Sequence, residues 1–276
     1  LKLIQNDFNN FQVLDKIINQ ISDVIILAGL VGDPITKKYE ELSNKINQIN
    51  TKKLIDYLFL QKLNKVIFVS TCSNYGFLEN NKKAREETQL NPLSIYAKNK
   101  VNIENYILSK KNKTSVCPVI LRFATAFGLS DRMRFDLTVN QFTIDILFKK
   151  NLLIYDSDTW RPYCHVKDFA RVMNIILNYN KDNIAFEIFN AGSDKNNYTK
   201  QEIIEKILSK LPFDNIKYEK NGVDKRNYFV DFSKIKKILN FDTLYDIEYG
   251  IDEIVDQFNK KKFNDYLFNQ NKYGNF

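Results

Sequence analysis

The segment Lys65-Val-Ile-Phe-Val-Ser-Thr-Cys-Ser-Asn-Tyr-Gly76 begins with a continuous apolar run and ends in small and polar residues. A continuous apolar run of this length predicts a strand that is buried on both faces of a parallel sheet. In open α/β sheets, ligands bind beyond the carboxyl ends of such strands. The segment therefore predicts one strand of a doubly wound, parallel α/β sheet, and it places a candidate site around the hydroxyl of Thr71.

The same alternation continues along the chain on both sides of this segment. Short apolar runs predict more strands, and apolar residues at helical spacing predict helices between them. Strands are expected at 24–28, 116–123 and 185–190, and helices at 39–63, 94–110, 137–148, 168–179, 199–211, 233–239 and 251–258. Thr199 followed by Glu202 predicts a capping box at one helix start. The asparagine-rich residues after Phe263 are expected to be loosely ordered.

The composition excludes several classes of protein. The net charge of +8 comes from lysines that are scattered along the chain, often in pairs, which is typical of solvated helix surfaces rather than of a nucleic-acid-binding stripe. No apolar run approaches the ~18 residues of a membrane helix. The three cysteines lack the spacing of metal ligands, and so few of them indicate a reducing cytoplasm. We expect a cytoplasmic protein without metal, nucleic acid or membrane as partner.

A second chemical signal is Tyr96-Ala-Lys-Asn-Lys100, which places a phenol and an ammonium on one face of a predicted helix. A neighbouring cation lowers the pKa of a phenol from about 10, so that tyrosine can exchange a proton with a substrate hydroxyl. The pattern alone arises by chance on many helices. It gains weight because Thr71 follows one strand and the small residues Ala28 and Gly29 follow another.

These segments resemble the extended short-chain dehydrogenase/reductases, in particular the NAD-dependent epimerase/dehydratase family that acts on nucleotide sugars. The resemblance runs from about Leu3 to about Phe258 and implies NAD, rather than NADP, as cofactor. It implies catalytic roles for Thr71, Tyr96 and Lys100. The cofactor contacts that it implies are Asp7, Leu27, Ala28, Gly29, Tyr96, Lys100 and Phe123.

The resemblance also implies a nucleotide-diphosphate sugar as substrate. Arg161 and Arg226 stand where the family binds the diphosphate, and guanidinium groups suit it because they pair in a bidentate way and stay charged. The full set of expected substrate contacts is Thr71, Thr125, Arg134, Asn140, Arg161 and Arg226. Residues 1–127 and 164–192 are expected to form a truncated Rossmann NAD-binding domain, 128–163 and 193–265 a smaller substrate-binding subdomain, and 266–276 a tail. A homodimer through helices 39–63 and 94–110 is implied as well.

Two features depart from the family pattern. The sequence contains no Gly-x-x-Gly-x-x-Gly or Gly-x-Gly-x-x-Gly, the loop that holds the pyrophosphate on backbone N–H groups. We therefore expect the first βαβ unit to be missing, the strand at 24–28 to lack a neighbour on its inner edge, and this chain alone to bind NAD poorly and to be inactive. Second, Cys72 and Ser73 replace the Asp-Glu pair of the family's 4,6-dehydratases, which disfavours dehydration.

The function expected from the resemblance is NAD-dependent epimerisation or dehydrogenation at a sugar carbon, C4 being favoured, in the synthesis of bacterial surface-polysaccharide sugars. Two alternatives stay open. One is a nucleotide-sugar 4,6-dehydratase. The other is a catalytically inactive relative that serves as a binding or regulatory protein, which the missing glycine loop and the basic charge favour. Neither the sugar nor the nucleotide base follows from the sequence.

Overall fold

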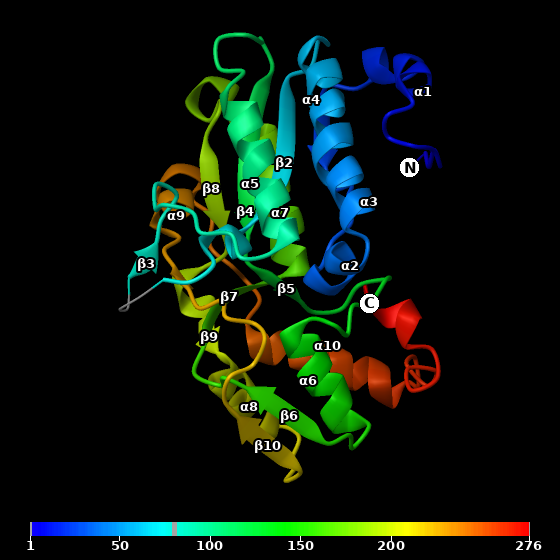
Figure 1. The fold of residues 1–276 in the computed structure, drawn as a ribbon, viewed down its shortest axis with the longest axis vertical. Helices are drawn as coiled ribbons and strands as arrows, with labels where there is room; N and C mark the ends of the chain where they lie inside the picture. The colour runs from blue at the N-terminus through cyan, green and yellow to red at the C-terminus, as the bar shows by residue number, and fades with distance from the viewer. Residues whose placement is uncertain (1, 79–81, 276) are drawn as a thin grey trace.

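The computed structural model describes residues 2–78 and 82–275, and its centre is a four-stranded parallel sheet (Figure 1). The strands are β1 (Asp23–Ile26), β2 (Lys65–Thr71), β4 (Cys117–Phe123) and β8 (Ile188–Ala191), in the order β1-β2-β4-β8. Every neighbouring pair is parallel. The carboxyl ends of all four strands therefore meet at one edge of the sheet.

Helices cover both faces of this sheet, which confirms the doubly wound architecture. In β2, the side chains of Val66 and Phe68 pack into an apolar cluster with α4 (Thr51–Phe59) and α5 (Ile95–Leu108). The intervening Ile67 packs on the other face with α7 (Val166–Asn178) and α9 (Ser233–Leu239). Side chains alternate between the faces of a strand, so a run buried on both faces must be apolar throughout.

A second group of elements lies below the carboxyl edge of the sheet in Figure 1. Helices α6 (Thr138–Leu147), α8 (Lys200–Leu208) and α10 (Ile247–Asn259) share one apolar cluster with the strand pair β6 (Leu152–Tyr155) and β10 (Ile216–Glu219). Strands β5 (Thr125–Phe127), β7 (Trp160–His165) and β9 (Asn197–Thr199) form a three-stranded sheet. The capping box predicted from Thr199 and Glu202 is present at the start of α8.

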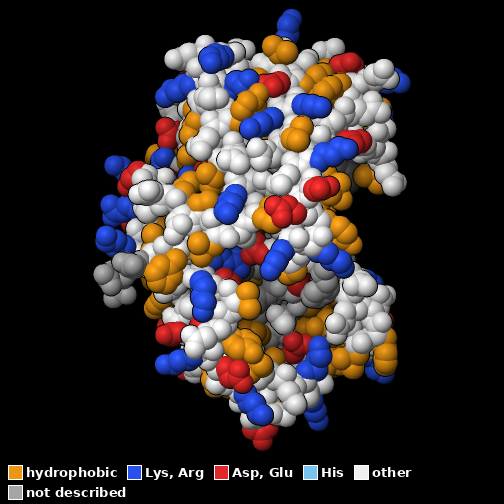
Figure 2. All heavy atoms as spheres, in the orientation of Figure 1, with side chains coloured by type: hydrophobic (Ala, Val, Ile, Leu, Met, Phe, Trp, Pro, Cys, Tyr) orange, Lys and Arg blue, Asp and Glu red, His pale blue; other side chains and the backbone are white. Residues whose placement is uncertain are grey.

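The remaining elements are short. They are α1 (Phe11–Asp15), η1 (Ile18–Gln20), α2 (Asp33–Lys38), α3 (Glu40–Asn44), β3 (Lys83–Ala84), η4 (Lys181–Asn183), η5 (Asp194–Asn196), β11 (Phe229–Val230) and η6 (Gln270–Tyr273). No helix in the described ranges combines the length and the apolar character that crossing a bilayer requires. In Figure 2, lysine and arginine side chains are spread over the visible face, with acidic side chains between them.

The expectation that the strand at 24–28 lacks a neighbour on its inner edge is wrong. Strand β1 pairs directly with β2, with Asp23 opposite Lys65 and Ile26 opposite Phe68. The expectation assigned this strand to the wrong place in the usual strand order. Pairing with β2 satisfies backbone N–H and C=O groups that would otherwise be buried without partners.

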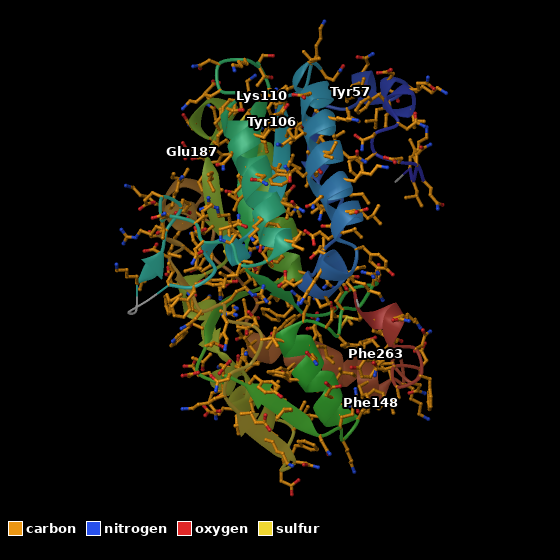
Figure 3. All side chains as sticks on the ribbon, in the orientation of Figure 1. Tyr57, Tyr106, Lys110, Phe148, Glu187 and Phe263 are labelled. Carbon is orange, nitrogen blue, oxygen red and sulfur yellow. The ribbon has the colours of Figure 1, made fainter. Side chains whose placement is uncertain are left out.

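Two further expectations need correction. The helix expected at 39–63 is helical without a break but shorter, from Glu40 to Phe59, and it includes a π-helical turn at Lys45–Asn50 between α3 and α4. The segment after Phe263 is not loosely ordered: Phe263, Tyr266 and Tyr273 are buried around Phe135. Figure 3 shows Phe263 in the same region as Phe148 of this cluster. Burial of several aromatic rings outweighs the polar composition of the segment.

Candidate functional site

The candidate catalytic residues lie where β2 ends and α5 begins. Thr71 is the last residue of β2 and is 9% exposed. Its Oγ1 accepts a hydrogen bond of 3.1 Å from the backbone N–H of Ser73, which caps the short 3₁₀-helix η3 (Cys72–Tyr75). On the other side, the hydroxyl of Ser94 caps α5 by accepting from the N–H of Ala97. Tyr96 follows in the first turn of α5 and is half-buried.

Lys100 connects these two elements. Its Nζ donates a hydrogen bond of 2.6 Å to the carbonyl oxygen of Val69 in β2, and it lies 5.7 Å from the centroid of the Tyr96 ring. The side chain is buried, and this is the one hydrogen bond of its ammonium within the described part of the chain. Lys100 thus lies beside Tyr96, and its ammonium retains N–H donors for a further hydrogen bond.

Burial dominates the proton equilibria of this pair. Burial raises the pKa of Tyr96, the carboxylate of Asp33 and the phenol of Tyr228 raise it further, and Arg134 lowers it. Burial lowers the pKa of Lys100 to about 8, and Glu104 opposes that change. The expectation that Lys100 lowers the phenol's pKa is therefore not met. Tyr96 is a protonated phenol at neutral pH and can donate a proton or a hydrogen bond.

The substitution Lys100→Met is expected to raise the thermal stability at pH 7. The pKa of Lys100 falls from 10.5 to about 8, so the buried ammonium disfavours folding by about 3 kcal/mol below pH 8. The unfolded chain binds more protons between these two values, and wild-type stability therefore recovers as the pH rises from about 8 towards 10.5. Denaturation of both proteins at pH 7 and pH 10 checks this. A variant less stable than wild type at pH 7 contradicts it.

A buried polar network that sequence reasoning missed lies behind the catalytic residues. Glu104 of α5 forms an ion pair with Arg122 of β4 at 2.7 Å, with side chains 1% and 3% exposed. The same carboxylate accepts hydrogen bonds from Ser70 and Asn74, which flank Thr71. Two signals were available: an arginine inside an apolar strand, and a glutamate one helical turn after Lys100. The network fixes the end of β2 against α5.

The loop after β1 carries the expected cofactor contacts. Leu27, Ala28 and Gly29 are exposed at the carboxyl edge of the sheet. The side chain of Asn47, also missed, holds this loop by bonding both the N–H and the C=O of Leu30 at 2.8 Å. Gly29 has a φ of +144°, and a Cβ there would lie 2.7 Å from the Asn47 Oδ1. Only glycine suits this close approach without strain.

The other two expected cofactor contacts, Asp7 and Phe123, make contacts elsewhere. Asp7 is exposed, and its carboxylate accepts a hydrogen bond of 2.8 Å from the N–H of Asn9. Phe123 ends β4, but its ring stacks on Phe169 of α7 at 3.7 Å between centroids. Thr125 lies in β5 and is half-buried.

Two expected diphosphate ligands do come together. Arg226 binds Asp224 through two hydrogen bonds of 2.7 Å, and Arg161 lies 3.2 Å from the same carboxylate. The Nη1 of Arg226 also lies 2.9 Å from the Oδ2 of Asp33 and donates to the Oγ of Ser73 at 3.3 Å. Arg226 therefore reaches the loops after both β1 and β2. Burial raises the pKa of Asp224, but the guanidinium groups of Arg226 and Arg161 outweigh it and hold this pKa well below its usual range.

Arg134 and Asn140 make other contacts than Arg161 and Arg226. Arg134 forms a bidentate pair with Asp136, and its Nη2 lies beside Gly32. Asn140 is buried, and its amide bonds the N–H of Gly128 at 2.9 Å and the C=O of Arg134 at 3.1 Å. In the structure, then, Asn140 supports the loop that carries Arg134.

A cavity of about 250 Å³ adjoins the paired arginines, and its lining includes Asp224, Val223, Tyr155, Phe142 and Lys200. The lining combines aromatic and apolar side chains with the charged Asp224 and Lys200, which suits a nucleoside beside a phosphate. Another cavity of about 200 Å³, near Asp194 and Asp242, contains none of the expected site residues.

The residues present fit one end of a dinucleotide. The small, exposed loop after β1 and the donor groups of Lys100 suit a nicotinamide riboside, which needs close backbone approach and hydrogen-bond donors for its hydroxyls. No glycine-rich phosphate loop occurs in the sequence. Within residues 2–78 and 82–275, no group of three or more His, Cys, Asp or Glu side chains is placed to hold a metal ion.

Comparisons with known proteins identify the family of this chain and solved structures of the same fold. The model of the NAD dependent epimerase/dehydratase family matches residues 1–192. A UDP-glucuronate 4-epimerase of Thermodesulfobacterium geofontis is 28% identical over 261 residues, which are 92% of this chain and 78% of that protein.

Two solved structures resemble the whole fold. A Bacillus cereus UDP-glucuronic acid 4-epimerase in complex with UDP-glucuronic acid and NAD gives a TM-score of 0.82 at 24% identity, covering 94% of this chain and 81% of its own. A dTDP-glucose 4,6-dehydratase of Streptomyces venezuelae with NAD bound gives 0.83 at 18% identity, covering 95% and 80%.

Proposed function

Because the chain belongs to the NAD-dependent epimerase/dehydratase family, we propose that it moves a hydride between NAD and one sugar carbon of a nucleoside-diphosphate sugar. We propose C4 as the carbon and epimerisation or dehydrogenation as the reaction. The name of the Thermodesulfobacterium geofontis relative, a 4-epimerase, supports this choice of carbon. We also propose that the protein is a cytoplasmic homodimer and that it acts in surface-polysaccharide synthesis.

In this proposal, Tyr96 exchanges a proton with the hydroxyl of the reacting carbon, and Thr71 shares a hydrogen bond with the same oxygen. Lys100 stands beside the phenol and holds the ribose of the cofactor with its remaining donors. Bound NAD supplies the hydride acceptor. Tyr96 is protonated when the site holds no substrate, so it must first release its proton to water. The resulting phenolate then accepts the proton of the sugar hydroxyl as the hydride leaves the same carbon, and a positively charged neighbour favours the first release.

The observation that carries the proposal is the convergence of Arg161 and Arg226 on one carboxylate next to Ser73, two residues beyond Thr71. Two guanidinium groups side by side can bind a diphosphate in place of Asp224. The adjoining cavity of about 250 Å³ can take the nucleoside. This arrangement supports a position of the sugar between the arginines and Tyr96, over the carboxyl end of β2.

The same geometry disfavours 4,6-dehydration. That reaction needs a carboxylic acid pair after the catalytic threonine, where this chain has Cys72 and Ser73. Cys72 is 1% exposed and burial raises the pKa of its thiol strongly, so it cannot serve as an acid or base at neutral pH. The Ser73 hydroxyl lies 3.3 Å from both Arg226 and Tyr228.

Turnover assays test the proposal. The purified chain is incubated with NAD and a panel of UDP- and dTDP-sugars, with NADH followed by absorbance and epimers by NMR. Epimer or keto-sugar formation supports the enzyme. Binding of both NAD and a nucleotide sugar without any turnover favours the alternative of a catalytically inactive binding protein.

We also propose the division of the chain into a cofactor part, residues 1–127 and 164–192, and a substrate part, residues 128–163 and 193–265. The apolar cluster of β2 with α4 and α5 contains residues of the first part alone and supports this division, whereas α9 of the second part packs against the central sheet. The boundary matters because Arg161 and Arg226 belong to the second part and Thr71 to the first.

Arg161→Gln and Arg226→Gln are each expected to weaken binding of UDP by about 10- to 100-fold, because each removes a charge-assisted hydrogen-bonding group worth about 1.5–3 kcal/mol. Isothermal titration calorimetry with UDP measures the effect. The matched control is Arg85→Gln, whose partner Asp231 lies outside the site and whose side chain is 59% exposed. UDP affinity that is equal in all four proteins contradicts the assignment of the diphosphate site.

A further inference from the structure

Asp33 occupies a position that the reaction proposed above leaves without a role. It is the first residue of α2, directly after the loop that follows β1, and α2 packs against α5, which bears Tyr96. Figure 1 shows α2 at the junction between the sheet with its helices and the lower group of elements. Its carboxylate is close enough to Tyr96 to raise the pKa of that phenol.

The two oxygens of Asp33 are used differently. Oδ2 lies 2.9 Å from the Nη1 of Arg226. Oδ1 is buried and has no hydrogen-bond partner among the residues that the structure describes. A buried oxygen without a partner is unfavourable, so this atom is available for a donor that a ligand brings.

The arginines and aspartates of this region are paired with one another. They are Arg134, Arg161, Arg226, Asp33, Asp136 and Asp224. Arg134 is held in a bidentate pair by Asp136. A diphosphate that binds Arg161 and Arg226 replaces the carboxylates that those arginines now contact. Asp33 then loses its cation while its carboxylate still lies near Tyr96.

We propose that Asp33 is a specificity-determining residue of the sugar subsite, which selects sugars that are neutral or carry an amino group and rejects sugars that carry a carboxylate. The inference rests on the proposed function, since it requires that a nucleotide sugar bind with its diphosphate on Arg161 and Arg226.

The expected preference follows from the hydrogen bond and the charge interactions that remain open to Asp33 once the diphosphate is bound. A sugar hydroxyl or ammonium can donate to Oδ1 of Asp33, which satisfies a buried acceptor. A sugar carboxylate brings no donor at neutral pH and places a like charge beside Asp33 in a partly desolvated site, where charge repulsion is stronger than in water. Arg134 offers little compensation, because Asp136 already neutralises it.

Binding of UDP, UDP-glucose and UDP-glucuronate tests this without turnover. The two sugars differ only at C6, which is a hydroxymethyl group in UDP-glucose and a carboxylate in UDP-glucuronate. For the wild-type chain we expect UDP-glucose to bind at least about tenfold more tightly than UDP-glucuronate. For Asp33→Asn, which removes the charge and keeps the shape, we expect this ratio to fall to about threefold or less. Because the result is a ratio, a change in the affinity for UDP itself cancels.

Asp33→Glu keeps the charge and is expected to retain the preference. Asp252→Asn is the matched control, since Asp252 pairs with Lys210 on the surface of α10, and its ratio should equal that of wild type. Circular dichroism verifies that each variant is folded, and Asp33→Ser replaces Asp33→Asn if the latter does not fold. Equal affinities for both sugars in the wild type, or a ratio that Asp33→Asn does not change, overturns the inference alone. Failure of the wild type to bind UDP overturns the proposed function as well.

Discussion

Replacing Tyr96 by phenylalanine is expected to lower the turnover of a nucleotide sugar by about 10²- to 10⁴-fold, the usual range for loss of a general acid or base. The change removes one oxygen and leaves the ring, which packs at the start of α5. Lys100 keeps its hydrogen bond to Val69 in the variant, so the geometry of the neighbouring ammonium is preserved. The kcat of both proteins, measured with NAD and the same sugar, gives the ratio.

Two controls, UDP binding and a matched tyrosine variant, separate an effect on the chemical step from an effect on folding. Tyr96→Phe should bind UDP within about threefold of wild type, because the proposed diphosphate ligands are Arg161 and Arg226. Tyr106→Phe is the control on the same helix: the Tyr106 hydroxyl donates to Asp56 at 2.6 Å, near Lys110 and far along α5 from Tyr96 (Figure 3). Its turnover should equal that of wild type. A Tyr96→Phe variant that retains more than about a tenth of wild-type kcat contradicts the proposed role.

The local sequence pattern predicted those elements whose apolar residues recur at the spacing of a strand or a helix. The strand at 65–70 corresponds to β2, and the helix at 233–239 has the same bounds as α9. The predicted cap at Thr199 bonds the N–H of Glu202, three residues later in the chain. In each case the residues that decide the structure are neighbours in the chain.

The features that sequence reasoning missed depend on partners far apart in the chain. Strand β1 gains its neighbour from a segment about forty residues later, and no local pattern specifies which strand that is. Asp33 meets Arg226 only because loops from both parts of the fold converge. The pKa of Tyr96 was misjudged for the same reason, since the extent of burial is a property of the assembled fold.

The substitution Glu104→Gln is expected to lower the free energy of unfolding by about 3–5 kcal/mol, because it leaves the guanidinium of Arg122 buried without a counter-charge. Chemical denaturation measures the loss. Glu187→Gln is the control (Figure 3): its carboxylate pairs with Lys234 at 2.7 Å but is 41% exposed, so its loss should stay below about 1 kcal/mol.

A double substitution distinguishes the loss of a charge partner from a general packing defect. In Glu104→Gln/Arg122→Met neither charge remains, so the double variant should lose less stability than the sum of the two single variants, by at least about 1 kcal/mol. Additive losses would mean that the two side chains act independently, despite the 2.7 Å between them. The ion pair also holds Ser70 and Asn74 on either side of Thr71. Since a small displacement of a catalytic group lowers turnover sharply, Glu104→Gln should reduce kcat even where the variant remains fully folded.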